Sequence, residues 1–388
     1  MLSNLLNFSG GPGALPPSVL DQTQRAIIAL PDTGISILGM SHRSDWFRRL
    51  LQEAQDNIRS FLDIPERFHI LFLQGGSSLQ FSMIPMNFAA GTKAAAEFVA
   101  SGYWSRKAIR EAEAVVRSRI VWDGVAEGYR RLPAWSSLDR SAQAPFLHFV
   151  SNETVEGLQF RDVPRSNGVP LIADMSSDFL SRRFDIGDYA MVYAHAQKNL
   201  GPAGVTVALI DDAMLSRIPA GLPPMLDYRT HVEHGSNYNT PPVFSIYVLN
   251  LVSRWLRDEI GGVDAMEKIN LSKAAMLYQA LERHPEMIEI HAEPAARSAM
   301  NVAFRFRDPA HHDIFLAEAN AAGFSGLEGH RSIGGLRASL YNAVSAQAVQ
   351  QLAGLLDDFC AAACLKHAGK ARRLGIKPKR PQQEPASS

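Results

Sequence analysis

The middle of the chain alternates short apolar runs rich in β-forming residues with segments of helical pattern, and this alternation limits the fold more than any other feature. Within each run the apolar residues are consecutive, which predicts strands that are covered on both faces. A mostly parallel sheet sandwiched by helices meets that requirement, so we predict an α/β fold. The strand-like runs cover residues 69–75, 94–102, 145–154, 169–177, 189–197 and 204–211.

The pattern changes after two consecutive prolines, Pro241 and Pro242. Two long segments of helical spacing follow, and we expect the first, which ends at a Gly-Gly pair, to bridge to a smaller α/β domain. That domain would contain a strand in "SAMNVAFRFRD" and a closing helix capped by Ser345. The predicted division is a large domain, 16–260, a small domain, 1–15 with 261–364, and a basic, disordered tail, 365–388.

The charge composition argues against a general nucleic-acid or membrane-binding protein. Lys and Arg total 39 and Asp and Glu total 39, so no net field attracts such partners. Positive charge is concentrated in the tail, where residues 365–388 contain seven Lys or Arg and one Glu. We interpret this segment as a solvated extension, with a partner-binding arm as the alternative.

The two cysteines, Cys360 and Cys364, lie one helical turn apart in an apolar stretch. Such a pair argues against a disulfide framework and against a zinc site, so we expect both to be buried core residues and predict no metal. The N-terminal residues lack the pattern of a signal peptide, and no run of about 18 apolar residues occurs. We therefore expect a cytoplasmic protein without a membrane partner.

A glycine-rich turn follows the first predicted strand in "LFLQGGSSLQF", before a helical pattern begins. Glycines allow the backbone to approach an anion, and a helix N-terminus offers unpaired N–H groups to it. Ser77 and Ser78 add two hydroxyls at this point. Taken alone, a phosphate site and an ordinary structural turn are both consistent with this segment, which lacks the ending of a P-loop.

Asp174 and Lys198 close two successive predicted strands. Alone, each has an ordinary explanation, the aspartate as a helix cap and the lysine as a surface residue. Together with the glycine-rich turn and Trp104 they match the needs of pyridoxal phosphate chemistry. A buried lysine can bond to the cofactor aldehyde, an aspartate can hold the pyridine nitrogen protonated, and an indole can stack on the ring.

Several longer motifs occur in one order along the chain: "NFSGGPGALP", "SHRS", "LQGGSSLQF", "GYW", "NET", "ADMSSDF", "AHAQKNLGPAGVT", "NTPP" and "GHRSIGGLRASLYNA". By these motifs the chain resembles the phosphoserine aminotransferase family of fold-type I pyridoxal phosphate enzymes, over about residues 5–364. The resemblance implies a large domain with a mostly parallel seven-stranded sheet and a smaller C-terminal α/β domain.

The resemblance also implies a role for particular residues. Lys198 matches the Schiff-base lysine, Asp174 the pyridine partner and Trp104 the stacking ring. Further cofactor contacts are implied for Ser77, Ser78, Thr154 and Gln197. Asn239 and Thr240 match a pair that reaches the cofactor phosphate of the neighbouring subunit, which implies an obligatory homodimer.

The substrates implied by the resemblance are glutamate and phosphorylated amino or keto acids, each of which carries two separated anionic groups. Guanidinium groups bind carboxylate and phosphate with two hydrogen bonds, so two cationic clusters are required. By resemblance, Arg337 takes the α-carboxylate. The distal phosphate or γ-carboxylate would face His42, Arg43, His330 and Arg331.

Two positions depart from the family pattern. His195 stands where relatives often have glycine, and it either shifts the pKa of the lysine or fills space, which we favour. The glycine-rich loop carries no arginine, although some relatives have one there, so distal anion binding would depend on the remaining cations.

The implied reaction is a two-stage transamination between glutamate and 3-phosphohydroxypyruvate, giving 2-oxoglutarate and O-phosphoserine. Alternatives within the same fold type are an alanine:glyoxylate aminotransferase and a cysteine desulfurase, neither of which needs paired His-Arg motifs. A binding protein without catalysis would not need a lysine and an aspartate at successive strand ends.

Overall fold

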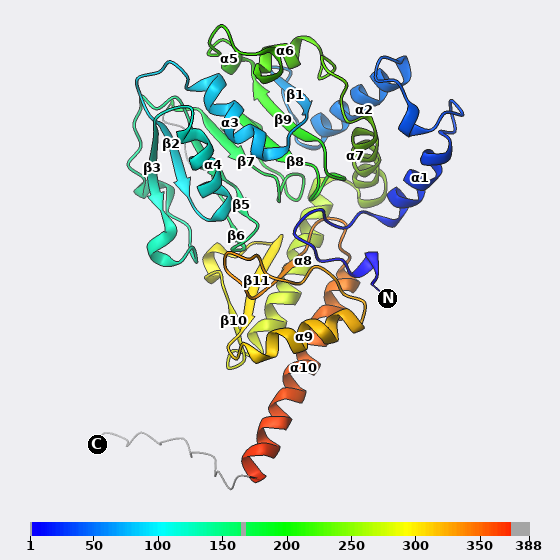
Figure 1. The fold of residues 1–388 in the computed structure, drawn as a ribbon, viewed down its shortest axis with the longest axis vertical. Coiled ribbons are helices and arrows are strands. Elements are labelled where there is room, and N and C mark those ends of the chain that lie inside the picture. Colours follow the sequence, from blue (N-terminus) through cyan, green and yellow to red (C-terminus); the bar gives the residue numbers. More distant parts are fainter. Residues whose placement is uncertain (1, 164–167, 374–388) are drawn as a thin grey trace.

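A computed structural model describes residues 2–163 and 168–373, with side chains described as far as residue 365. Its main feature is a seven-stranded sheet in the order β1-β9-β8-β7-β4-β2-β3 (Figure 1). The strands are β1 (Phe68–Leu73), β2 (Ala96–Ala100), β3 (Ser118–Asp123), β4 (Leu147–Val150), β7 (Leu171–Asp174), β8 (Met191–His195) and β9 (Thr206–Asp211). A short hairpin, β5 (Asn152–Glu153) and β6 (Leu158–Gln159), follows β4.

The large sheet is mostly parallel, as predicted. Strands β3, β2, β4, β7 and β8 run in one direction, and β9 is antiparallel to both of its neighbours. The six apolar runs each contain one of these strands, which confirms the predicted fold class. The seventh strand, β3, was not predicted from its own sequence because it lies at the sheet edge and is only half buried, so it has no continuous apolar run.

Helices cover both faces of the large sheet because successive residues of its inner strands point to opposite sides. In β9, Val207 and Leu209 join one core cluster and Ala208 and Ile210 join another. The first cluster is closed by α1 (Pro17–Ile28), α2 (Asp45–Phe61) and α7 (Val243–Trp255). The second is closed by α3 (Gly76–Phe88), α4 (Tyr103–Glu113) and α6 (Tyr228–Glu233), near the short helix α5 (Asp212–Leu215).

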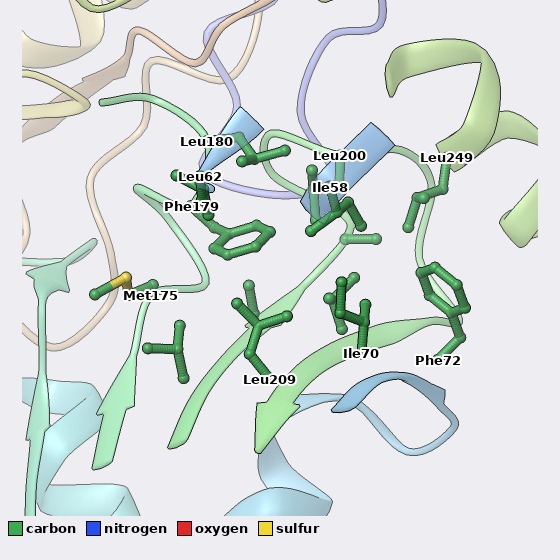
Figure 2. Packing of buried hydrophobic residues seen from close by; sticks show 14 of the residues in the cluster. Ile58, Leu62, Ile70, Phe72, Met175, Phe179, Leu180, Leu200, Leu209 and Leu249 are labelled. Carbon is green, nitrogen blue, oxygen red and sulfur yellow. The ribbon is translucent and has the colours of Figure 1, made fainter. Parts of the chain in front are cut away.

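Figure 2 shows the first cluster from close by. Side chains from the strands, among them Ile70 and Leu209, meet Ile58 of α2 and Leu249 of α7. Each large aliphatic side chain buried in this way contributes roughly 1.5–3 kcal/mol relative to an exposed one.

A smaller antiparallel sheet forms a second core with its own helices (Figure 1). Phe8 and Ala14 from the N-terminal segment pack into this core. The predicted domain boundaries stay a prediction, and these two cores are consistent with it. The elements are β10 (Ile288–Ile290), β11 (Asn301–Phe306), β12 (Leu336–Ser339), α8 (Val263–Glu282), α9 (Ala310–Ala321) and α10 (Ala346–Arg373).

The helix that was expected to bridge the two parts does not do so. Helix α7 packs against α1 and α2 on the large sheet, and it is buried almost all round because its sequence is apolar almost all round. A π-helical turn, Leu256–Ile260, follows, and Gly261 and Gly262 adopt positive φ angles of 88° and 96°. The chain then continues in α8, which packs against α10.

Helix α10 closes the smaller core. Its cap is as predicted, since Ser345 Oγ accepts a hydrogen bond from the backbone N–H of Ala348 at 3.1 Å. Cys360 is buried as expected, but Cys364 is exposed, which corrects the prediction. The reason is that α10 extends past the smaller core here, as the 74% exposure of Leu365 and Figure 1 show.

By length and composition alone, one stretch of the described residues, Ala346–Leu365, could cross a membrane, and 39% of it is buried against the protein. Its buried face includes Val349, Leu352 and Leu356 of the smaller core. The predicted disordered tail, 365–388, is corrected at its start, because α10 continues to Arg373; residues 374–388 lie outside the described residues.

Candidate active site

A cavity of about 380 Å³ lies at one edge of the large sheet, where strands β1, β4, β7 and β8 have their carboxyl ends. These ends meet because β4, β7 and β8 are parallel and β9 reverses the direction twice between β8 and β1. Ligands of open α/β sheets bind at this edge. The lining residues are Gly75, Gly76, Ser77, Ser78, Trp104, Val150, Asn152, Thr154, Asp174, Ser176, Ser177, His195, Gln197, Lys198 and Gly204.

The structure therefore brings seven of the predicted site residues together in one cavity, although their roles stay predictions. They come from five separate segments of the chain, so their proximity is a product of the sheet topology. The seven are Ser77, Ser78, Trp104, Thr154, Asp174, Gln197 and Lys198.

Lys198 lies just after β8 and is 8% exposed. Its Nζ donates a hydrogen bond to Oγ1 of Thr154 at 2.7 Å and lies 5.5 Å from the centroid of the Trp104 ring. Burial lowers the pKa of Lys198 to about 8, while the nearby Asp174 carboxylate opposes that change and Arg337 adds to it. An amine with this pKa is a far better nucleophile and base at neutral pH than an ordinary lysine.

Asp174 ends β7 and is 4% exposed. Its Oδ1 accepts a hydrogen bond from the backbone N–H of Ser176 at 2.8 Å. Burial raises the pKa of Asp174, against the opposing effects of the Ser176 hydrogen bonds and of Lys198. Beside it in the sheet register, Tyr193 shares a 2.8 Å hydrogen bond with Nε2 of the buried His148. The carboxylate is thus held in a dry setting that favours a cationic partner.

The glycine-rich turn has the backbone conformation that its sequence predicts. Gly75 and Gly76 have φ angles of 90° and 66°, the left-handed region that glycine adopts without strain; Gly75 is the N-cap of α3 and Gly76 its first residue. Ser77 Oγ lies 2.7 Å from Ser176 Oγ, and Ser78 Oγ accepts a hydrogen bond from Lys107 Nζ at 2.8 Å. Hydroxyls and a helix N-terminus therefore face one end of the cavity.

Two buried glutamates that sequence reasoning missed hold the helix that carries Trp104. Glu153 accepts hydrogen bonds from the backbone N–H groups of Trp104 and Ser105, each at 3.0 Å. Glu156 accepts from the N–H of Tyr103 at 2.9 Å. Together they satisfy three N–H groups of the first turn of α4. The available signal was two acidic residues, one in and one after the "NET" motif.

The surroundings of these two glutamates differ. Both oxygens of Glu153 accept hydrogen bonds, whereas Oε2 of Glu156 is buried and has no partner among the described residues. Burial and the charge of Glu153 raise the pKa of Glu156 well above its ordinary value, against the influence of Arg337. These influences favour a proton on Glu156, since two neighbouring buried carboxylates do not both ionise.

His195 lines the cavity as a neutral ring. Burial, followed by the charge of Lys198, lowers the pKa of His195 to about 4. A side chain on Gly76 would contact the His195 ring at 3.4 Å, so the ring fills the space beside the glycine turn. This finding agrees with the space-filling interpretation of this residue.

The predicted substrate residues of the small-sheet segment are not among the residues that line the cavity. Arg337, on β12, packs against the backbone of Gly10 so closely that a side chain there would collide with the guanidinium. The His330 ring lies 4.5 Å from the ring of Tyr103, the neighbour of Trp104, while Arg331 is exposed.

The remaining predicted residues lie on the surface of the chain. Arg43, Asn239 and Thr240 are exposed, and His42 is partly exposed. The two segments touch, because Nδ2 of Asn237 donates a hydrogen bond to the backbone oxygen of His42 at 2.9 Å. The chain therefore presents the "SHR" and "NTPP" motifs side by side, outside its own cavity.

The cavity is suited to pyridoxal phosphate. It offers a buried amine of lowered pKa for an aldehyde, a buried carboxylate for a ring nitrogen, an indole for the ring face and hydroxyls at a helix N-terminus for a phosphate. Its volume lies in the range of small-ligand sites. The fold and this site define an α/β enzyme of the pyridoxal phosphate-dependent class.

Comparisons with known proteins give the family. The sequence model of the class-V aminotransferase family matches residues 5–352 of this chain. A phosphoserine aminotransferase from Geobacillus kaustophilus is 45% identical over 353 residues, which cover 91% of this chain and 97% of that protein. The chain thus belongs to the phosphoserine aminotransferase family of class-V aminotransferases, which confirms the resemblance seen in the sequence.

Solved structures agree with this assignment. A phosphoserine aminotransferase from Bacillus circulans subsp. alkalophilus has a TM-score of 0.89 at 40% identity, over 92% of this chain and 98% of that chain. A phosphoserine aminotransferase from Trichomonas vaginalis, solved with pyridoxal phosphate bound, has a TM-score of 0.84 at 35% identity, over 90% of this chain and 99% of that chain.

Proposed function

We propose that this chain catalyses the reversible transfer of an amino group between L-glutamate and 3-phosphohydroxypyruvate, giving 2-oxoglutarate and O-phospho-L-serine. The observation that carries the proposal is a buried Lys198 of lowered pKa, at a strand end facing Asp174 and Trp104, in a chain 45% identical to a phosphoserine aminotransferase over nearly its whole length. The reaction fits serine biosynthesis. Participation in pyridoxine synthesis and a cytoplasmic location stay predictions.

The cofactor in this proposal is pyridoxal phosphate. When bound, it supplies an aldehyde that bonds to an amine and a ring that withdraws electrons from the substrate α-carbon. Lys198 would hold the aldehyde, Asp174 the ring nitrogen and Trp104 the ring face. Thr154 and Gln197 would add polar contacts, and residues 75–78 would hold the phosphate.

Lys198 also carries the proton chemistry in this proposal. With a pKa of about 8 its amine can both accept and release a proton near neutral pH, which suits a group that would take a proton from the substrate α-carbon and deliver it to the carbon of the former aldehyde. Thr154 Oγ1 fixes the direction of Nζ by the 2.7 Å hydrogen bond.

Arg337 is the proposed partner of the substrate α-carboxylate. Among the described residues its buried Nε has no hydrogen-bond partner, and its charge influences both Lys198 and Glu156. A guanidinium that lacks such a partner beside the catalytic lysine can still bind a carboxylate with two hydrogen bonds. His330 and Arg331 lie on the loop that precedes β12, and they would face the distal phosphate or γ-carboxylate of the substrate.

A homodimer completes the site in this proposal. None of His42, Arg43, Asn239 and Thr240 is among the residues that line the chain's own cavity, and their two segments are in contact, so we infer that they serve the cavity of the neighbouring subunit. Large apolar side chains are exposed nearby in the sequence, which supports an interface there. They are Ile28 (80% exposed), Ile35 (50%) and Leu38 (66%).

The alternatives find less support. Neither cysteine lines the cavity, since Cys360 and Cys364 both lie on α10 in the smaller part, so no thiol is in place for a desulfurase. An alanine:glyoxylate aminotransferase from Nostoc shares the fold at only 17% identity. Such an enzyme acts on substrates without a distal phosphate.

Half-reaction spectroscopy tests the proposal. The coloured complex with pyridoxal phosphate should convert to its amine form with glutamate and with O-phosphoserine, and scarcely with alanine. An equal response to alanine would exclude the dianionic substrates while leaving the cofactor assignment intact. Reduction with borohydride followed by peptide mapping should label Lys198, and a label on any other lysine would overturn the site.

A further inference from the structure

A positively charged side chain that belongs to none of the family motifs lies at the end of the cavity where a phosphate would bind. Lys107 stands one turn after Trp104 on α4, and α4 packs beside α3. Its Nζ donates a hydrogen bond to Ser78 Oγ at 2.8 Å and lies 5.6 Å from the Trp104 ring centroid. Ser78 and Trp104 both line the cavity, so the ammonium sits at the cavity rim.

This charge has no acidic partner among the described residues, where its contacts are Ser78 and the indole. The loop beside it, residues 75–79, contributes N–H groups and hydroxyls but no cation. An ammonium group next to such hydrogen-bond donors is suited to bind an anion, which would balance its positive charge.

We propose that Lys107 binds the anionic group that occupies the Ser77–Ser78 end of the cavity, and so supplies from α4 the cation that the glycine-rich loop lacks. The inference rests on the proposed function and adds a specific residue that would bind a phosphate or carboxylate group in the same site. Because Ser78 Oγ accepts its hydrogen bond from Lys107, the Ser78 hydroxyl hydrogen is available to the same anion. Ammonium and hydroxyl then act together on one phosphate or carboxylate.

Such an anion has two sources, the cofactor phosphate and the distal group of the substrate. The test compares the parent with Lys107→Gln. Lys107→Arg serves as the charge-retaining variant, and Arg110→Gln removes a charge from an exposed site on the same helix. One arm measures the dissociation constants of pyridoxal phosphate and of pyridoxal, which lacks the phosphate. The other arm measures half-saturation by O-phosphoserine and by alanine.

Because Lys107→Gln removes one charge-assisted hydrogen bond, the affinity for the affected phosphate ligand should fall about tenfold in this variant. If affinity falls for pyridoxal phosphate but not for pyridoxal, the anion that Lys107 binds is the cofactor phosphate. If affinity falls for O-phosphoserine but not for alanine, that anion is the distal group of the substrate. Lys107→Arg should recover most of the loss, and Arg110→Gln should resemble the parent within about twofold. Ser78→Ala combined with Lys107→Gln should cost less than the sum of the single changes.

The proposal fails if Lys107→Gln changes every constant by less than about twofold, or if the binding of pyridoxal and of alanine is weakened as much as that of pyridoxal phosphate and of O-phosphoserine. It also fails if Arg110→Gln has the same effect, which would indicate a general loss of charge. If the chain did not take up pyridoxal phosphate at all, the proposed function would fall. Binding of inorganic phosphate to the cofactor-free parent and to Lys107→Gln would then still decide the role of Lys107.

Discussion

Lys198 donates a hydrogen bond from Nζ to Oγ1 of Thr154, a residue 44 positions earlier in the chain, across 2.7 Å. The contact joins the turn after β8 to the residue that follows β5, so it exists only in the folded sheet. It also fixes the amine in a buried place, and burial is the main reason for its lowered pKa.

The first prediction concerns pH. At pH 7, a lysine with a pKa of about 8 is about one tenth uncharged, far more than an ordinary lysine with a pKa of 10.5. The rate at which the cofactor-free protein forms colour with pyridoxal phosphate should therefore rise about tenfold per pH unit and level off above about pH 8. Stopped-flow absorbance checks this, and a rise that continued toward pH 10 would contradict the assigned pKa.

The same shift affects stability with a definite sign. Because the folded pKa of Lys198 is lower than the unfolded one, the unfolded chain binds more protons between about pH 8 and pH 10.5. The free energy of unfolding of the cofactor-free protein should gain from this group as the pH rises through that window. Urea denaturation of the parent and of Lys198→Met isolates the contribution, which should be missing in the variant.

The second prediction concerns the two buried glutamates. Glu153→Gln places an amide donor where the N–H groups of Trp104 and Ser105 need an acceptor, so the affinity for pyridoxal phosphate should fall about tenfold. Glu156→Gln imitates a protonated carboxyl and should change that affinity by less than about threefold. Equal losses in both variants would show that the proton is not held by Glu156.

An infrared measurement tests the same pair without any ligand. Protein labelled with ¹³C-glutamate should show an acid carbonyl band from a protonated side chain, and that band should disappear in Glu156→Gln. Persistence of the band in that variant would assign the proton elsewhere.

The third prediction concerns a fully buried lysine far from the chemistry. Lys273 on α8 donates hydrogen bonds from Nζ to the backbone oxygens of Leu340, Tyr341 and Val344, at 2.8–3.0 Å. Lys273→Met removes all three of these buried hydrogen bonds and should cost about 3 kcal/mol of unfolding free energy. The exposed Lys268→Met, on the same helix, should cost less than about 0.5 kcal/mol. Urea denaturation of both variants provides the comparison.

The fourth prediction concerns Arg337 and Arg331. Arg337→Ala should lower kcat/KM for every amino donor by a factor of about one hundred, because all of them carry an α-carboxylate. Arg331→Ala should affect O-phosphoserine and glutamate but leave alanine nearly unchanged. Steady-state kinetics with the three donors separates the two outcomes, and parental behaviour of both variants would show that the substrate lies elsewhere.

The fifth prediction concerns the dimer. If Arg43 and Asn239 serve the neighbouring cavity, Lys198→Ala and a chain carrying Arg43→Ala with Asn239→Ala should each be nearly inactive. Refolding the two together creates mixed dimers with one intact site, which should restore about a quarter of the parental activity. No recovery, with mixed dimers shown to form, would place all these residues in one subunit's site.

Much of the fold was predictable because buried parallel strands leave a strong local signal. The runs around Leu171–Asp174 and Met191–His195 are apolar on both sides, so their place in a covered sheet follows from hydrophobicity alone. Strand β3 gave no such signal, since an edge strand needs only one apolar face. The exposure of Cys364 also escaped prediction, because sequence spacing does not say where the core ends.

Some residues of the site could likewise be predicted from the sequence, and others could not. Lys198, Asp174 and the Gly75–Gly76 turn could be found from the sequence, since each interrupts an apolar pattern with a residue that is costly or unusual there. Glu153, Glu156 and Lys107 were not predicted, because charged residues ordinarily face solvent and nothing in their local sequence marks them as buried or as facing a cavity.

Local composition and pattern were enough to predict most of the strands and several residues able to do chemistry, because both kinds of feature depend on only a few neighbouring residues. Which of those residues meet depends instead on the arrangement of the folded chain. The ordering of β1, β4, β7 and β8 in one sheet brings their carboxyl ends together, and packing of α4 against α3 brings Lys107 to Ser78. The reason is that non-local contacts depend on how the whole core packs, which no short stretch of sequence encodes.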